Sequence, residues 1–98
     1  MTEEEENYLE KFVYVLEHFN IIFLISIGSY IDGHFCLYKD HDKWIISYGD
    51  HGIISDFKEE SSLEEAVKYL INKISYDEFE EKQLNKQLKI VSNNTRLS

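Results

Sequence analysis

The close spacing of turn-forming residues between positions 22 and 57 is the feature that most restricts the fold of this chain. Short runs rich in isoleucine and aromatic residues alternate there with turns that carry glycine, aspartate and histidine. Such runs predict β-strands, which we place at residues 22–30, 34–38, 43–48 and 53–57. Parallel neighbours need a crossover of a dozen or more residues. The short connections therefore predict a four-stranded antiparallel meander.

Helical periodicity flanks this β-rich region on both sides. Apolar residues recur every three or four positions over residues 3–20 and again over residues 62–75, which is typical of helices with one buried face. Before each segment, a serine or threonine precedes a glutamate by three residues, the spacing of a capping box. A third helical segment opens at Asp77 with a thinner apolar stripe, which favours packing by one edge or contact with a partner.

Length and composition indicate a single folded domain. The chain has 98 residues, of which 43% are hydrophobic and 14% aromatic, and this excludes a disordered chain. We expect an α+β domain spanning residues 1–98, in which an N-terminal helix and one or two C-terminal helices pack on one face of the sheet. We expect Trp44 to be buried and residues 92–98 to form a frayed tail.

The sequence favours a cytoplasmic protein without membrane contact. Its longest apolar run covers residues 21–25, far short of the roughly 20 residues that cross a bilayer. Four glutamates follow the initial Met and Thr, so we expect no secretory signal. Cys36 is the single cysteine, so no disulfide forms within the chain. We expect its thiol to be buried and inert.

A metal site is the first chemistry that the histidines suggest. Asp40, His41 and Asp42 occupy one turn, and Asp50 and His51 occupy another. Carboxylate and imidazole groups suit divalent ions. The strand between the two turns is about 20 Å long at roughly 3.3 Å per residue, so it separates them. Solvated turns are therefore the favoured interpretation, and we predict no metal.

Other catalytic arrangements are also absent from the sequence. His34 and Cys36 share one face of a predicted strand, but a nucleophile also needs an orienting group and an oxyanion site. Nineteen carboxylates produce close acid pairs by chance, so a glycosidase-like pair carries no signal. The glycine-bearing turns match no phosphate-binding motif. We predict a protein that is not an enzyme and binds no cofactor.

Charge points to a protein partner. Ten basic residues stand against 19 acidic ones, which gives a net charge of −9 and disfavours nucleic acid and anionic membranes as partners. Lys86, Lys89 and Arg96 collect bases near the C-terminus, but three bases beside an acidic body make a poor nucleic-acid footprint. An acidic surface steers a basic protein toward it. Charge that only confers solubility is the alternative.

Residues 44–70 combine a tryptophan-bearing strand, a charged glycine turn, a short strand, an acidic pair and a helix, marked by Trp44, Tyr48, Gly52, Phe57, Glu59, Glu60, Ala66 and Leu70. This combination resembles small immunity proteins of bacterial polymorphic-toxin systems. The family pattern has an acid and an arginine before the glycine, where this chain has Asp50 and His51. The resemblance covers little more than a quarter of the chain. It implies a cytosolic inhibitor, without catalysis, that binds a toxin domain, often a nuclease.

We expect contacts with such a basic toxin on exposed turns and helix starts, where recognition residues concentrate, together with one aromatic anchor. The candidate residues are Asp40, Asp42, Tyr48, Asp50, Glu59 and Glu60. The alternative function is a phage-type protein inhibitor or nucleic-acid mimic that acts on a host defence enzyme. Acidity and small size suit that alternative equally well.

Overall fold

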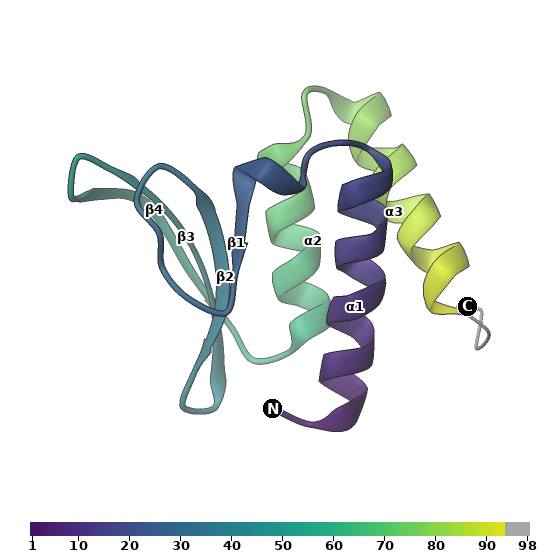
Figure 1. Cartoon of the computed structure of the whole chain (residues 1–98), viewed down its shortest axis with the longest axis horizontal. Helices are drawn as coiled ribbons and strands as arrows, with labels where there is room; N and C mark the ends of the chain where they lie inside the picture. The colour runs from purple at the N-terminus through teal and green to yellow at the C-terminus, as the bar shows by residue number, and fades with distance from the viewer. Residues whose placement is uncertain (94–98) are drawn as a thin grey trace. The chain divides into compact units, whose positions relative to one another are not determined.

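The computed structural model describes residues 1–93, which divide into two units (Figure 1). One unit combines residues 1–22 with residues from 75 onward, and the other spans residues 23–74. The elements in chain order are α1 (Glu3–His18), the 3-10 helix η1 (Ile22–Leu24), β1 (Ile25–Ile27), β2 (Phe35–Asp40), β3 (Lys43–Asp50), β4 (Ile53–Glu60), α2 (Leu63–Ile74) and α3 (Glu78–Ser92). The α+β prediction is confirmed, with two C-terminal helices.

Side-chain caps start the two helices of the first unit. The Thr2 hydroxyl accepts a hydrogen bond from the Glu5 N–H at 3.1 Å, and the Glu5 carboxylate accepts one from the Thr2 N–H at 2.9 Å. This is the predicted capping box. Asp77 caps α3 by accepting from the Glu80 N–H at 2.9 Å. Helix α1 ends at His18, two residues before the predicted boundary.

Helices α1 and α3 pack on each other within this unit. Their buried residues recur at helical spacing and are Leu9, Phe12, Val15, Leu16, Leu84 and Leu88. The Lys11 ammonium donates a hydrogen bond to the Ser92 carbonyl oxygen at 3.2 Å, which ties the end of α3 to α1. Helix α3 ends at Ser92, and Asn93 is its C-cap residue. The rest of the predicted frayed tail, residues 94–98, lies outside the described residues.

The second unit is a four-stranded sheet with α2 packed against β2, β3 and β4. Figure 1 shows α2 on one side of this sheet. Leu37, Trp44 and Ile46 share one face of the sheet and are buried. Trp44 is 2% exposed, so its predicted burial is confirmed. Helix α2 buries an apolar stripe made of Leu63, Ala66, Val67, Leu70 and Ile71.

The predicted antiparallel pairing of the first two strands is wrong. β1 pairs parallel to β2, with Ile25 opposite Phe35. β1 has only three residues, about 10 Å at roughly 3.3 Å per residue. A connection of residues 28–34 is long enough to return over that distance. Gly28 and Gly33, with φ of 103° and 80°, reverse the chain at the two ends of this loop.

The meander is confirmed for β2, β3 and β4, which pair antiparallel in that order. Residues 22–24 form η1 instead of the start of a strand. All three antiparallel strands extend beyond their predicted ends. For β2 and β3 the reason is that two-residue turns suffice to join them to the next strand. In the β3–β4 turn, His51 and Gly52 both have positive φ, 53° and 77°, as tight hairpins favour.

Candidate functional site

The two faces of the sheet differ in what covers them. Trp44 and Ile46 lie on the face against which α2 packs. On the opposite face, Cys36, Ser47 and Phe57 form one row across β2, β3 and β4. No helix of this unit lies on that second side in Figure 1. We call it the open face, and it also carries Tyr38, Ile45, Gly49, Ile54 and Glu59.

The loop of residues 28–34 folds over part of the open face. The Cys36 sulfur lies 3.3 Å from the backbone nitrogen of Ile31 and 3.4 Å from its carbonyl oxygen. The Ser26 hydroxyl donates to the Ser29 carbonyl oxygen at 2.8 Å. Small residues on the sheet leave room for this loop. Cys36 is fully buried, which confirms the predicted burial of its thiol.

Gly49 lets the same loop approach β3. The Gly33 N–H donates to the Gly49 carbonyl oxygen at 2.7 Å. A Cβ atom added at Gly49 would collide with the Tyr30 hydroxyl and would lie 3.0 Å from the Ile53 carbonyl oxygen. Glycine is therefore the residue that this crossing of loop and strand requires.

Tyr30 and Asp32 fix the far end of the loop. The Tyr30 hydroxyl donates to one oxygen of Asp32 at 2.8 Å, and the Gly52 N–H donates to the same oxygen at 3.2 Å. The hydrogen bond to Asp32 is the main cause that raises the pKa of Tyr30 to about 12. The same bond lowers the pKa of Asp32. A carboxylate charge is thus held beside the β3–β4 turn.

Apolar side chains lie exposed on and beside the open face. Ile54 and Phe57 are 52% and 53% exposed on β4, and Ile31 in the covering loop is 46% exposed. Tyr38 is half-buried on the same face. Exposed apolar groups that share one face are typical of protein contact surfaces.

Charge in this unit is unevenly distributed over the sheet, its turns and α2. The open face, its covering loop and its two turns hold five carboxylates and one lysine, namely Asp32, Asp40, Asp42, Asp50, Glu59 and Lys43. The opposite face together with α2 holds four carboxylates and four lysines, namely Asp56, Glu60, Glu64, Glu65, Lys39, Lys58, Lys68 and Lys73. Of this first group, Asp40, Lys43 and Glu59 lie on the open face itself, Asp32 lies in the covering loop, and Asp42 and Asp50 lie in or beside the turns, so the excess of negative charge belongs to these parts taken together.

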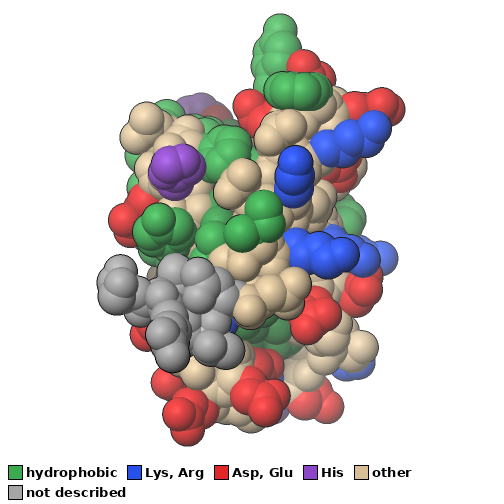
Figure 2. All heavy atoms as spheres, turned by 90° about the vertical axis from the view of Figure 1, so that its right-hand side faces the viewer, with side chains coloured by type: hydrophobic (Ala, Val, Ile, Leu, Met, Phe, Trp, Pro, Cys, Tyr) green, Lys and Arg blue, Asp and Glu red, His purple; other side chains and the backbone are tan. Residues whose placement is uncertain are grey.

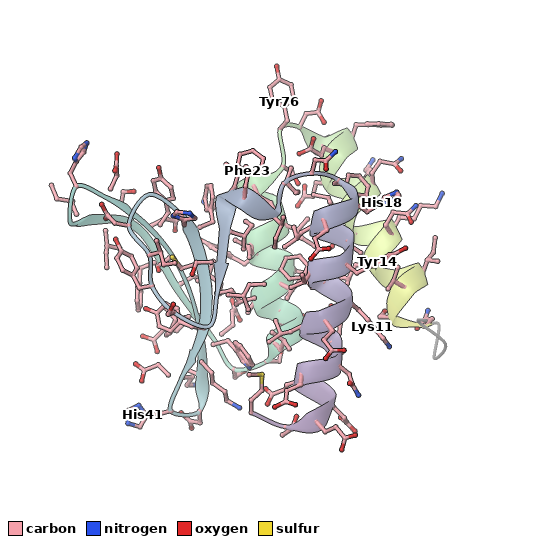
Figure 3. All side chains as sticks on the ribbon, in the orientation of Figure 1. Lys11, Tyr14, His18, Phe23, His41 and Tyr76 are labelled. Atoms are coloured by element: carbon pink, nitrogen blue, oxygen red, sulfur yellow. The ribbon has the colours of Figure 1, made fainter. Side chains whose placement is uncertain are left out.

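The structure separates four of the predicted site residues, Asp40, Asp42, Asp50 and Glu59, into two groups. Asp40 and Asp42 flank His41 at the β2–β3 turn, where Figure 3 shows the histidine at the tip. Glu59 lies near that end of β4, opposite Ile45. Asp50 lies at the other end of β3, about 23 Å away along an eight-residue strand.

The other two predicted residues point elsewhere. Tyr48 is on the α2 side of the sheet, half-buried, with its ring centre 4.8 Å from that of Phe35. Glu60 is on the same side, 3.8 Å from the Lys58 ammonium. Glu59 and Glu60 were predicted on a link before the helix, but they are the last two residues of β4.

Asp32, Ile54 and Phe57 lie on or beside the open face but are not among the predicted site residues. Ile54 and Phe57 are three positions apart, which in a regular strand puts them on opposite faces. A bulge shifts the register between Tyr48 and Gly49, so both β4 side chains share the open face. The predicted antiparallel pairing of strands 22–30 and 34–38 would place Asp32 in the hairpin turn between them, and the parallel pairing of β1 with β2 removes that turn. The signal for Asp32 would have been the tyrosine two residues earlier, at hydrogen-bond reach.

Metal and nucleophile chemistry gain no support from the geometry. Within residues 1–93, no group of three or more histidine, cysteine or acidic side chains comes together. His41 lies 2.8 Å from Asp40, and His51 lies 3.6 Å from Asp50, in separate turns. The His34 ring faces the Asp32 carbonyl oxygen at 3.2 Å.

No helix in the described part of the chain has the length and apolarity needed to span a membrane.

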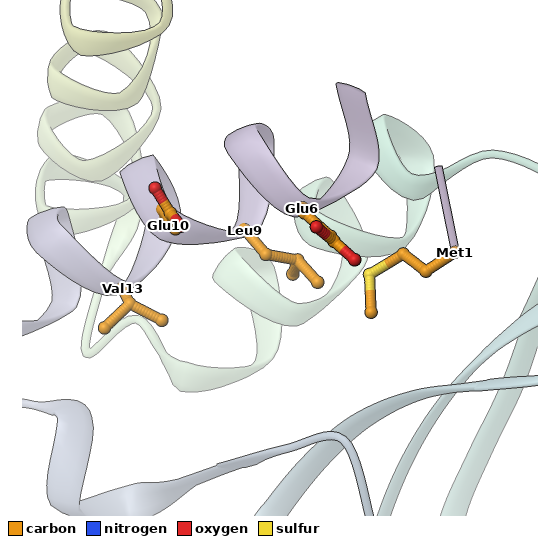
Figure 4. Close-up of a pocket in the computed structure, with 5 residues that line it drawn as sticks. All are labelled: Met1, Glu6, Leu9, Glu10 and Val13. Atoms are coloured by element: carbon orange, nitrogen blue, oxygen red, sulfur yellow. The ribbon is translucent and has the colours of Figure 1, made fainter. Parts of the chain in front are cut away.

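The first unit carries a hollow of about 500 Å³ along α1 (Figure 4). Its lining residues are Met1, Glu6, Leu9, Glu10 and Val13. All five come from one helix and the chain end before it, so no polar groups converge from several elements as a small-molecule site requires.

Lysines gather on the exposed side of α3. Lys82, Lys86 and Lys89 follow one another at helical spacing and are all exposed. Figure 2 shows lysine side chains collected along one edge of its face. Arg96, the third base of the sequence-based cluster, lies outside the described residues.

The chain was compared with protein-family models, with curated proteins and with solved structures, and none of the three comparisons found a match.

Proposed function

We propose that this chain is an immunity protein that binds and neutralises a cognate bacterial toxin domain through its open face. One observation carries the proposal: five carboxylates and a single lysine lie on the open face, its covering loop and the two turns of the sheet unit, whereas the charges of the α2 face and of α2 balance. A toxin that cleaves nucleic acid has to present a basic cleft to phosphates. Such a cleft is attracted to a surface of this kind. In this proposal the protein acts in the cytoplasm, without cofactor and without catalysis.

The apolar part of the open face supports a protein partner over mimicry of nucleic acid. A mimic needs carboxylates spaced like phosphates along one face. Here the carboxylates of Asp40 and Asp50 stand at opposite ends of β3, and exposed Phe57 and Ile54 lie on the face between the turns. Buried apolar anchors supply most of the affinity in protein interfaces, while surrounding charges mainly set the association rate.

Co-expression with candidate toxins encoded by neighbouring genes tests the proposal. We expect the protein to restore growth of cells that make the toxin and to co-purify with it. Reversing two charges, Asp40→Lys with Asp50→Lys, should lower the association rate by about tenfold at low salt. Both side chains are exposed, so the fold should persist. The wild-type rate should also fall as salt rises.

A matched control carries the same change of charge on α1: Glu10→Lys with Glu17→Lys, both exposed in the wild type. This variant should associate at a rate much closer to that of the wild type. If the protein neither restores growth nor co-purifies with any neighbouring toxin, the immunity function is wrong. Binding to a host defence nuclease, competed by DNA, would then support the inhibitor or mimic instead.

A further inference from the structure

We infer that the partner engages this protein by adding an extended, basic segment to the edge of β4 as a fifth strand. The inference rests on the proposed function and names how the open face would be used. β4 is the last strand in the sheet order. In residues 1–93 its outer edge pairs with no other strand. The unpaired N–H and C=O groups of such an edge form a ready template for an incoming strand.

Only this edge of the sheet is long enough. β4 has eight residues, whereas β1 at the opposite edge has three and follows directly on η1. Edge strands are usually protected by proline, by lysine or by bulges. The chain contains no proline. The bulge lies at the start of β4, where Tyr48 pairs with Asp56 and Gly49 with Ile54, so the register is regular from Asp56 to Glu60.

The one lysine of β4 does not guard the edge. Lys58 lies on the α2 side, with its ammonium 3.8 Å from Glu60 and 6.0 Å from the centre of the Tyr69 ring. Asp56 is engaged on that side as well, because it accepts from the Tyr69 hydroxyl at 2.9 Å and lies 3.5 Å from the Lys73 ammonium. These contacts draw both side chains toward α2 and leave the outer edge accessible.

The side chains of β4 on the open face specify what the incoming strand must carry. Phe57 is exposed and pairs best with an aromatic or β-branched neighbour. Glu59 is exposed and has no ion pair within residues 1–93, so a lysine or arginine opposite it is favoured. The matching segment therefore carries a β-branched or aromatic residue opposite Phe57 and, two positions along on the same face, a lysine or arginine opposite Glu59.

A second copy of this chain is a poor occupant of the same edge. Antiparallel pairing of two β4 strands would place carboxylates near one another, because Asp56, Glu59 and Glu60 fall within five consecutive residues. Like charges opposite each other destabilise a strand pair. Charge complementarity thus favours a foreign basic segment.

Amide hydrogen exchange on the whole protein provides the test. The probe is a short peptide of valine, threonine and lysine in which a β-branched residue and a lysine stand two positions apart, on the same face of the strand. We expect the peptide to slow exchange by about tenfold at every second amide of β4, those that face outward. The control peptide has the same sequence with alternate backbone nitrogens methylated, which keeps its charge and side chains but removes its donors. It should give no protection.

Charge reversal within β4 tests whether binding of the basic peptide depends on a carboxylate of this strand. Glu59→Lys should weaken binding of the basic peptide by about tenfold. Glu17→Lys makes the same change of charge in the other unit at an exposed position of α1 and should leave binding close to that of the wild type.

Two outcomes in this experiment overturn the inference. The first is a basic peptide that binds without protecting β4 amides. The second is protection of β4 without peptide that rises with protein concentration, which would identify a second copy as the occupant. The proposed function can fail separately. Loss of toxin neutralisation with intact protection of β4 by the peptide removes the immunity function and leaves strand addition standing. A Glu59→Lys protein that no longer binds peptide but still neutralises the toxin at wild-type affinity overturns strand addition alone.

Discussion

Gly49 sits where the loop of residues 28–34 meets β3, and its missing side chain is what allows the contact. An added Cβ would collide with the Tyr30 hydroxyl. We predict that Gly49→Ala lowers the free energy of unfolding by about 1–3 kcal/mol, the usual cost of overpacking. Urea unfolding followed by the fluorescence of Trp44, the single tryptophan, measures this change.

A double-mutant cycle identifies the cause of that loss. Tyr30→Phe removes the hydroxyl that the new methyl group meets. The loss caused by Gly49→Ala should therefore be smaller in the Tyr30→Phe background than in the wild type. Strictly additive losses would show that the collision with Tyr30 is not the source of the instability.

Asp32 gives the stability of the sheet unit a specific dependence on pH. Its pKa in the folded protein lies below the ordinary value of 3.8, chiefly because Tyr30 donates a hydrogen bond to it. A depressed folded pKa means that this stabilisation is present above pH 3.8 and is lost as the pH falls through the folded pKa. We predict that the wild type exceeds Asp32→Asn in stability at pH 7 and that the difference shrinks toward zero below pH 3.8.

Urea midpoints measured across the pH range for both proteins test this prediction. Asp42→Asn is the control, because Asp42 is exposed in the β2–β3 turn. Its difference from the wild type should change less with pH. A wild-type advantage over Asp32→Asn that is the same at pH 3 and pH 7 would contradict the assigned hydrogen bond.

At the level of elements, sequence patterns predicted what depends on local chemistry. The capping boxes, the apolar stripe of α2 and the antiparallel pairing of β2 to β4 all follow from spacing within one segment or between close neighbours. The predicted strand over residues 22–30 is too long. This segment contains enough isoleucine and phenylalanine for a full strand. Only three of its residues pair, and they pair parallel to β2. That choice depends on a loop that folds back over Cys36 and reaches Gly49, which lies 16 positions after Gly33 in the sequence.

The candidate site shows the same division. Turn chemistry located Asp40, Asp42 and Asp50 correctly in or beside turns. The face to which Tyr48 and Glu60 belong depends on strand register, and a bulge displaces that register in β4. A one-residue shift moves side chains to the opposite face. Residue composition therefore indicated an acidic surface but not which side of the sheet carries it.

Helix α3 depends on its cap more than α1 or α2 does, because its buried apolar stripe contains only Leu84 and Leu88. We predict that Asp77→Ala lowers the free energy of unfolding by about 1 kcal/mol, because the Glu80 N–H loses its acceptor. Asp77→Asn keeps an acceptor oxygen and should retain most of the stability. Circular dichroism during heating compares the two. Equal losses in both variants would show that the cap is not what stabilises this helix.

For the whole molecule, we predict one cooperative unfolding transition. We expect a single domain whose N-terminal helix packs on the sheet, and such a domain unfolds in one transition. Two probes report on different units. Trp44 fluorescence follows the sheet unit, whereas ellipticity at 222 nm mainly follows α1 and α3, which have 16 and 15 residues against 12 in α2. The two midpoints should coincide. Two separated transitions would show that the units of residues 1–22 with 75–93 and of residues 23–74 unfold independently.

The loop of residues 28–34 determines how fast a reagent in solution can reach the thiol of Cys36. It covers the fully buried sulfur of Cys36, the only thiol in the chain. A thiol-specific reagent can reach this sulfur only during moments when the loop lifts from the sheet. The labelling rate therefore counts those openings, and it should increase in Gly49→Ala and Tyr30→Phe well before global unfolding. A partner bound to the open face should keep the loop on the sheet and slow the labelling. The labelling rate of Cys36 therefore reports how often the loop opens in the free protein and in the complex.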